Sequence, residues 1–245
     1  MGSKNKYCPF IVPIIQKAID DNNIKEYIEF FVGGANVIDK IECDSRIGYD
    51  RSKTLIALLD QASKDFSLIP ENGNREIWDK GKSFVKDGKD CDLELYEIGA
   101  IEFLGSFSNG GFPRGYAKNK DGRNYYQEAY RNLEKQAPNL KDIIFKNSNY
   151  EEINPKDFSN KVIYLDPPYQ NTKKYGYTKD NVFNYEHFWN WVRELSKNNI
   201  VFISEQYAPK DFEIVWKKDV KRTCGKTNDF KATEKLFRFK EIDFL

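Results

Sequence analysis

The stretch VIYLDPPY, residues 162–169, decides the fold. Its first half is typical of a buried strand, and Asp166, Pro167, Pro168 and Tyr169 follow where that strand should end. Two consecutive prolines make the following loop rigid, which an ordinary turn does not require. Parallel strands bring their carboxyl ends to one edge of a sheet, where ligands of open α/β folds bind. The stretch therefore predicts an α/β protein with a binding loop that begins at Asp166.

Apolar runs on both sides of this stretch predict further strands of the same sheet. They are expected at residues 27–32, 46–49, 143–145 and 200–203. Helices are expected at residues 9–19, after a capping Ser52, and around residues 188–195. This alternation is typical of a mostly parallel sheet with crossover helices. Two later segments, residues 212–216 and 235–239, predict a closing hairpin.

The middle of the chain has a different character. Between about residues 61 and 141, glycines, aromatic residues and charges mix without a sustained period. A chain of 245 residues can bury one substantial core with an inserted subdomain. We therefore expect a catalytic domain made of residues 1–60 and 142–245, and an insertion at residues 61–141.

Two further strand ends carry suggestive residues. Gly33 and Gly34 follow the first predicted strand, and glycines let a backbone approach a ligand closely. Asp50 ends the second, where an acid can accept hydrogen bonds from a ribose diol. Taken alone, these residues fit a tight turn and a helix-capping acid better. Together with the loop at Asp166 they indicate a nucleoside-cofactor site.

The loop itself suits methyl transfer to an amine. The exocyclic amine of adenine is a weak nucleophile because its lone pair is delocalised into the ring. A carboxylate and an adjacent carbonyl that both accept the amine hydrogens favour its nucleophilic form, and Asp166 and Pro167 fit these roles. A base reaches such a loop only outside the duplex, where Tyr169 offers a ring to stack on it. We predict Asp166, Pro167, Pro168 and Tyr169 as the catalytic residues.

Over nearly its whole length the chain resembles the Dam-like adenine-specific DNA methyltransferases, particularly their short phage and prophage members. Residues 166–169 resemble the catalytic motif, which is the most specific. Residues 2–6 resemble the N-terminal motif beside the methionine part of the cofactor, and residues 29–37 resemble the glycine motif. Asp50 corresponds to the ribose acid, and residues 149–150 correspond to the pair that flanks the cofactor adenine. Residues 204–205 and 233–237 resemble later motifs of the family.

The resemblance implies a Rossmann-like methyltransferase fold with a mostly parallel seven-stranded sheet and an inserted target-recognition subdomain. It also implies S-adenosylmethionine as the cofactor and site-specific methylation of a flipped adenine in double-stranded DNA. The cofactor-binding residues that it implies are Gly2, Lys4, Phe31, Val32, Gly33, Gly34, Ala35, Asn36, Asp50, Arg51, Asn149, Tyr150 and Asp166.

Three residues depart from the family pattern. Phe30 stands where the family usually has proline, Ala35 where it often has glycine, and Asn149 in place of a common aspartate. These departures predict a weaker affinity for the cofactor, and they leave open a DNA-binding protein whose methylation has decayed. A methyltransferase acting on an RNA or protein amide amine is another alternative. The order of the motifs and the position of the insertion favour DNA.

The net charge gives no global signature of nucleic-acid binding, because the 39 Lys and Arg residues are balanced by 38 Asp and Glu residues. Any basic footprint must be local, and candidate stretches are residues 118–123, 173–174 and 217–226, although such runs are more often solvated faces. Arg114 and Arg123 of the insertion are candidates for phosphates or guanine, although solvated loop arginines explain them equally well. Tyr175 and Tyr177, which follow the catalytic loop, are candidates for closing over the extruded base.

Other classes of protein are disfavoured. Four widely scattered cysteines and a single His187 predict neither a metal site nor a disulfide framework. No apolar run approaches the ~20 residues of a membrane span, and the N-terminus lacks the apolar segment of a secretory signal. We expect a cytoplasmic monomer or weak dimer that needs no metal and no membrane.

Overall fold

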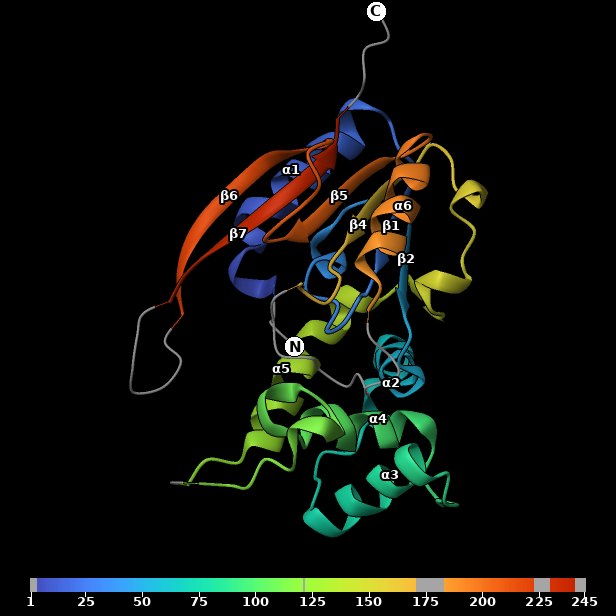
Figure 1. The fold of residues 1–245 in the computed structure, drawn as a ribbon. Coiled ribbons are helices and arrows are strands. Elements are labelled where there is room, and N and C mark those ends of the chain that lie inside the picture. The colour runs from blue at the N-terminus through green and yellow to red at the C-terminus, as the bar shows by residue number, and fades with distance from the viewer. Residues whose placement is uncertain (1–3, 121, 171–182, 223–229, 241–245) are drawn as a thin grey trace, which may run out of the picture. The chain divides into compact units, whose positions relative to one another are not determined.

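The computed structural model describes residues 4–120, 122–170, 183–222 and 230–240 (Figure 1). Seven strands form a sheet in the order β3-β2-β1-β4-β5-β7-β6. β4 is parallel to β1 and β5, and β2 is parallel to β3, whereas β7 is antiparallel to β5 and β6. The strands are β1 Glu26–Phe30, β2 Ser45–Asp50, β3 Ile143–Asn147, β4 Val162–Leu165, β5 Ile200–Glu205, β6 Phe212–Arg222 and β7 Phe230–Phe239. The predicted Rossmann-like α/β fold with a mostly parallel seven-stranded sheet is confirmed.

The α-helices are α1 Cys8–Asp21, α2 Lys53–Lys64, α3 Arg75–Asp87, α4 Leu95–Leu104, α5 Tyr125–Leu140 and α6 Tyr185–Ser196. The predicted cap is present at the start of α2, where the Ser52 hydroxyl accepts a hydrogen bond from the amide of Leu55 at 3.3 Å. The closing hairpin is also present, and its strands extend well beyond the predicted segments. No helix in the described ranges is both long and apolar enough to cross a bilayer.

The chain divides into two compact units. Unit one comprises residues 1–5, 32–40 and 46–149, and unit two comprises residues 6–31, 41–45 and 150–245. This division groups residues that lie close together in space, whatever their function. The predicted division by function, with an insertion at residues 61–141, stays a prediction.

In unit two, helices cover both faces of the parallel strands β1, β4 and β5 (Figure 1). The side chains of β1 alternate between these faces. The ring of Phe30 makes an edge contact with Trp191 of α6, whereas Tyr27 lies close to Cys8 of α1. All four residues of β4 are buried, as expected for a strand covered on both faces. This buried strand ends directly at the predicted catalytic loop.

Unit one contains β2, β3 and the helices α2 to α5. α4 is buried on nearly all sides and therefore has no amphipathic period, whereas α5 buries only one face. α2 and α4 pack so closely that a Cβ at Gly99 would lie 2.1 Å from the Thr54 carbonyl oxygen. A smaller apolar cluster joins α3, α4 and the loop after them; its buried members are Trp78, Ile98, Ile101 and Phe112.

Candidate active site

The predicted catalytic loop starts at the carboxyl end of β4. Leu165, the last residue of the strand, is paired with Phe30 of β1 and with Ile203 of β5, so Asp166 follows at the point where three parallel strands end. Asp166 is half-buried and Pro167 is buried. The placement of these residues at the strand end agrees with the sequence prediction.

Three later elements hold this loop. The hydroxyl of Tyr185, at the start of α6, donates to the Pro168 carbonyl at 2.9 Å. The amide of Gln170 donates to Glu205 of β5 at 3.1 Å, and the Tyr169 hydroxyl donates to Glu234 of β7. The Tyr185 bond engages the carbonyl of Pro168 and not that of Pro167, which is the acceptor in the predicted mechanism. The loop is therefore held through main-chain atoms of Pro168 and Gln170, the two residues that flank Tyr169.

Burial makes the electrostatics of this network unusual. Burial and the nearby charge of Asp166 raise the pKa of Glu205 to about 7, against the opposing effect of backbone amides that donate to its carboxylate. One of these amides belongs to Gln206, at 2.6 Å. The pKa of Tyr169 is well above its ordinary value, first because the ring is buried and then because Asp166 and Glu234 are close. Tyr169 is therefore a neutral hydrogen-bond donor at any physiological pH.

In unit one, the predicted cofactor loop follows β1. Gly33 and Ala35 both have left-handed backbone conformations, with φ of 50° and 54°. The Asp50 carboxylate accepts hydrogen bonds from the amides of Gly33 at 3.1 Å and Ser52 at 2.9 Å. Burial raises the pKa of Asp50, and these two amides act in the opposite direction. The structure thus brings the glycine loop and the predicted ribose acid together.

A residue that no local sequence feature identifies also supports this loop. The side-chain amide of Gln136, on α5, donates to the carbonyls of Gly34 and Ala35, each at 3.1 Å. Lys40 donates to the carbonyl of Asn36 at 2.8 Å. Gln136 lies a hundred residues away in the chain, so only the tertiary fold identifies it.

Two predicted cofactor residues, Phe31 and Tyr150, meet in unit two. Their ring centroids are 5.4 Å apart, within an aromatic cluster that includes Phe183 and Phe188. Phe30, the residue that departs from the family pattern, packs edge-on against Trp191 and Phe158. Its ring therefore belongs to the apolar core of unit two.

The remaining predicted residues differ in their surroundings. Among the cofactor residues, Lys4 and Val32 are buried, Asn36 and Asn149 are half-buried, and Arg51 is exposed. Of the DNA candidates, Arg123 is paired with Glu128 through two hydrogen bonds of 2.9 and 2.6 Å, and Arg114 is half-buried. Gly2, Tyr175 and Tyr177 lie outside the described residues. Within the described ranges, no three His, Cys, Asp or Glu side chains are grouped as metal ligands would be.

Comparisons with known proteins identify relatives of the chain. Residues 1–218 match the sequence profile of the family described as D12 class N6 adenine-specific DNA methyltransferase. The type II methyltransferase M.MjaIII of Methanocaldococcus jannaschii is 25% identical over 201 residues, which are 71% of this chain and 68% of that protein.

Solved structures of low similarity also align. TrmN from Thermus thermophilus is 8% identical with a TM-score of 0.39; the alignment covers 95% of this chain and 49% of TrmN. The rRNA methyltransferase aviRa from Streptomyces viridochromogenes is 10% identical with a TM-score of 0.40, covering 93% of this chain and 83% of aviRa. Likenesses at these TM-scores carry no conclusion about the present chain.

A mostly parallel sheet with a rigid acidic loop at the end of β4 defines an α/β protein that works at the carboxyl edge of its strands. The family match makes the class specific. The chain belongs to the D12 class N6 adenine-specific DNA methyltransferases, and it is a DNA adenine methyltransferase. The family and activity predicted from the sequence are confirmed, and the alternative of an RNA or protein substrate is not supported.

Proposed function

We propose that the chain transfers a methyl group from S-adenosylmethionine to the exocyclic amine of an adenine that is flipped out of duplex DNA at a specific sequence. The observation that carries this proposal is the loop at Asp166, which is rigid, ends a buried strand, and is fixed by Tyr185, Glu205 and Glu234. Membership of the family supports the use of DNA and of this methyl donor.

The surroundings of Asp50 fit the ribose of such a donor. A carboxylate has about four acceptor positions; the amides of Gly33 and Ser52 use two of them, and the Arg51 backbone also hydrogen-bonds to this acid. The acceptor capacity that remains is available to a ribose hydroxyl. The left-handed conformations at Gly33 and Ala35 turn the backbone sharply beside this acid, so that main-chain groups can approach a ligand. We assign the ribose to Asp50 and the remaining contacts with the cofactor to the residues predicted from the sequence.

When bound, the cofactor supplies an electrophilic methyl group on a sulfonium. The chain's own contribution is to position and activate the amine. Asp166 accepts one amine hydrogen and the Pro167 carbonyl accepts the other, which favours the pyramidal form of the nitrogen. Positive charge develops on this nitrogen during attack, so the carboxylate stabilises the transition state more than the neutral amine. One proton of the amine must leave afterwards, either to Asp166 or to water.

Tyr169 has the role of holding the flipped base. Its hydroxyl is tied to Glu234, so the plane of the ring is fixed before a base arrives. A preset ring loses little entropy when it stacks on a base, and such stacking contributes about 1–3 kcal/mol. Tyr169 therefore increases the affinity for the flipped base, whereas Asp166 increases the rate of methyl transfer.

Target recognition is assigned to residues 61–141, with Arg114 and Arg123 as candidates for phosphate or base contacts. Because Arg123 is already paired with Glu128, contact with DNA requires it to exchange that partner for a phosphate or a base. Tyr175 and Tyr177 stay proposed partners of the extruded base. We also predict that the chain needs no metal, that it is a monomer or a weak dimer, and that it is located in the cytoplasm.

The proposal is tested by the rate of tritiated methyl transfer to DNA with the Asp166→Ala variant. We expect turnover to fall by about 100- to 1000-fold, the usual cost of removing one electrostatic partner of the transition state. Melting temperature should change little because Asp166 lies beyond the buried strand, and much of the cofactor affinity should remain because the other predicted cofactor residues are unchanged. Near-normal turnover of a folded variant would contradict the mechanism. If the wild type binds no cofactor at millimolar concentration, with or without DNA, the chain is instead a decayed enzyme.

A further inference from the structure

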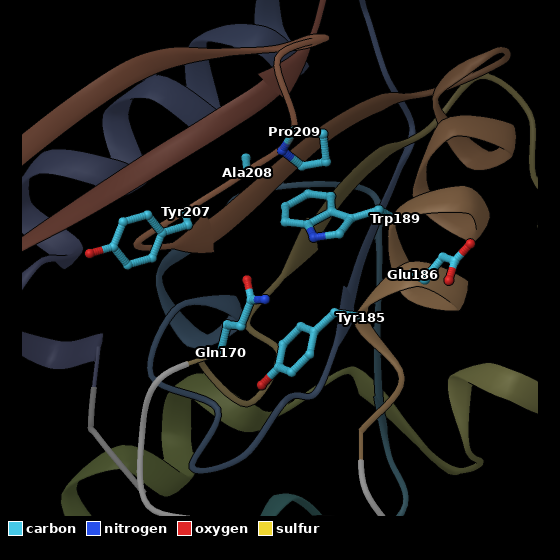
Figure 2. A pocket seen from close by; sticks show the side chains of 7 residues that line it. All are labelled: Gln170, Tyr185, Glu186, Trp189, Tyr207, Ala208 and Pro209. Atoms are coloured by element: carbon cyan, nitrogen blue, oxygen red, sulfur yellow. The ribbon is translucent and has the colours of Figure 1, made fainter.

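Unit two has a pocket beside the catalytic loop that the mechanism above does not use. Its volume is about 330 Å³, and its walls include the side chains of Gln170, Tyr185, Trp189 and Tyr207 (Figure 2). Asp166 and Pro167, which must contact the amine of the target adenine, are not among the lining residues. The pocket therefore lies next to the place of the reacting base and does not coincide with it.

The lining has the chemistry of a site for a nucleobase. Three aromatic rings surround the opening, and in Figure 2 the amide of Gln170 lies between the rings of Tyr207 and Tyr185. Aromatic rings stack on bases of any kind, whereas an amide both donates to and accepts from a base edge. Glu186, also in the lining, can accept from an exocyclic amine but would repel a phosphate. The pocket thus favours the uncharged base of a nucleotide over its phosphate.

Tyr207 is the most informative of these residues. Its side chain is 56% exposed, so its ring is accessible to a base that enters the pocket. The ammonium of Lys235 lies 5.4 Å from the centre of this ring and donates to the Gln206 carbonyl at 2.8 Å. Lys235 does not line the pocket. A cation placed behind a stacking ring suits the phosphate that is attached to a bound base.

The pocket is coupled mechanically to the catalytic loop. Gln170 immediately follows Tyr169, and its amide is held by Glu205. Tyr185 donates to the carbonyl of Pro168, so two walls of the pocket are parts or partners of the loop. The pocket and the catalytic loop are therefore neighbours that share these hydrogen bonds.

We infer that this pocket receives a base adjacent to the target adenine on the same DNA strand. The inference rests on the proposed function, because it requires a single target adenine to be held at Asp166 and Tyr169. Occupation of the pocket would fix the strand against the catalytic loop while the adenine is out of the duplex. It would also make a base beside the target contribute to affinity without any contact with the insertion.

The test uses abasic substitution in DNA of the mapped target sequence. Duplexes that lack one base at a time on either side of the target adenine are titrated with the wild type and with Tyr207→Ala, in the presence of the demethylated cofactor. For the wild type, we expect one flanking position at which loss of the base weakens binding by about 10-fold, the effect of one lost stacking contact. At that position the Tyr207→Ala variant should bind abasic and intact duplexes equally.

Phe10→Ala is the matched control. Phe10 is also an exposed ring of unit two, at 39%, with the ammonium of Lys218 3.8 Å from its centre, but it does not line the pocket. This variant should keep the wild-type pattern. If Tyr207→Ala keeps that pattern too, or loses the same affinity for every duplex, the inference is wrong. If the wild type neither binds nor methylates DNA, the proposed function itself fails.

Discussion

The loops that follow β4 and β1 are held in different ways. The loop at Asp166 is fixed by side chains, among them the buried acids Glu205 and Glu234. The loop at Gly33 is fixed by left-handed backbone conformations and by the neutral amide of Gln136. Both loops are held by an acid, since Asp50 accepts from the Gly33 amide, but only the second loop also depends on left-handed backbone conformations. Substitutions and pH should therefore separate methyl transfer from cofactor binding.

The largest effect on cofactor binding is expected from Asp50→Ala. Loss of the ribose acceptor should weaken binding of S-adenosylmethionine by about 1.5–3 kcal/mol, because charge-assisted hydrogen bonds are lost. Calorimetric titration measures this change. Asp44→Ala is the control, since Asp44 is exposed and pairs with Lys25 at the surface. An unchanged affinity in the Asp50 variant would remove this acid from the site.

Glu205→Gln should act on kcat instead. A glutamine has one acceptor oxygen, so it cannot accept from the amides of both Gln170 and Gln206, and the loop should shift. We expect kcat to fall by about 10- to 100-fold, the cost of a small misplacement of catalytic groups, while cofactor affinity stays constant.

Glu234→Gln is the matched comparison for this substitution. Its amide oxygen can still accept from Tyr169, so only the charge assistance of one bond is lost and kcat should fall by about 3-fold. Single-turnover methylation with saturating cofactor measures both variants. Equal rates for the two variants would show that the loop does not need two acceptor oxygens at position 205 to hold its place.

The pH dependence should follow Glu205. Its carboxylate accepts with both oxygens, so protonation removes one acceptor and the transfer rate should decline as pH falls through about 7. The effect on stability has the opposite sign. Because the native pKa lies above its ordinary value of 4.5, the neutral carboxyl contributes stability that is complete below pH 4.5 and is lost as pH rises through about 7.

Rate profiles of the wild type and Glu205→Gln between about pH 5.5 and 8.5 test this dependence, and at low pH the wild-type rate should fall toward that of the variant. The glutamine variant cannot titrate at this position, so its inflection near neutrality should disappear. A profile of the same shape in both proteins would assign the inflection to another group.

The smallest effect is expected from Ala35→Gly. Ala35 is buried with a φ of 54°, a conformation that costs an alanine about 1 kcal/mol more than a glycine. Glycine adds entropy to the unfolded chain, which offsets part of this gain. A net rise in unfolding free energy of about 0.5 kcal/mol should be seen by denaturant titration. A loss of stability would mean that packing of the methyl group outweighs the strain.

The two loops also differ in how far the sequence predicts them. The strand at residues 162–165 and its Asp-Pro-Pro-Tyr loop are local features, and both are found where predicted. Gly33 and Asp50 are likewise adjacent to strand ends and meet as expected. Gln136 and Tyr185 carry no local signal, because their partners are set only when α5 and α6 pack.

Two other features could be recognised only in part from the sequence. In the segment at residues 61–141, α4 was missed because it is buried on nearly all sides and an all-round apolar helix has no amphipathic period. The helices α3 and α5 bury one face each, so their period was present in the sequence and was overlooked. Glu205 follows an apolar run, as Asp166 does, so its position at a strand end was predictable. Its role as a double acceptor follows only from the contact with Gln170.

The central claim is that the loop at Asp166 directs a methyl group to the amine of adenine in DNA. It is tested most directly by mass spectrometry of nucleosides from duplex DNA incubated with the protein and S-adenosylmethionine that carries a deuterated methyl group. The account predicts labelled N6-methyladenine from the wild type and almost none from Asp166→Ala. Label found only on cytosine, or equal label on adenine from both proteins, would contradict it.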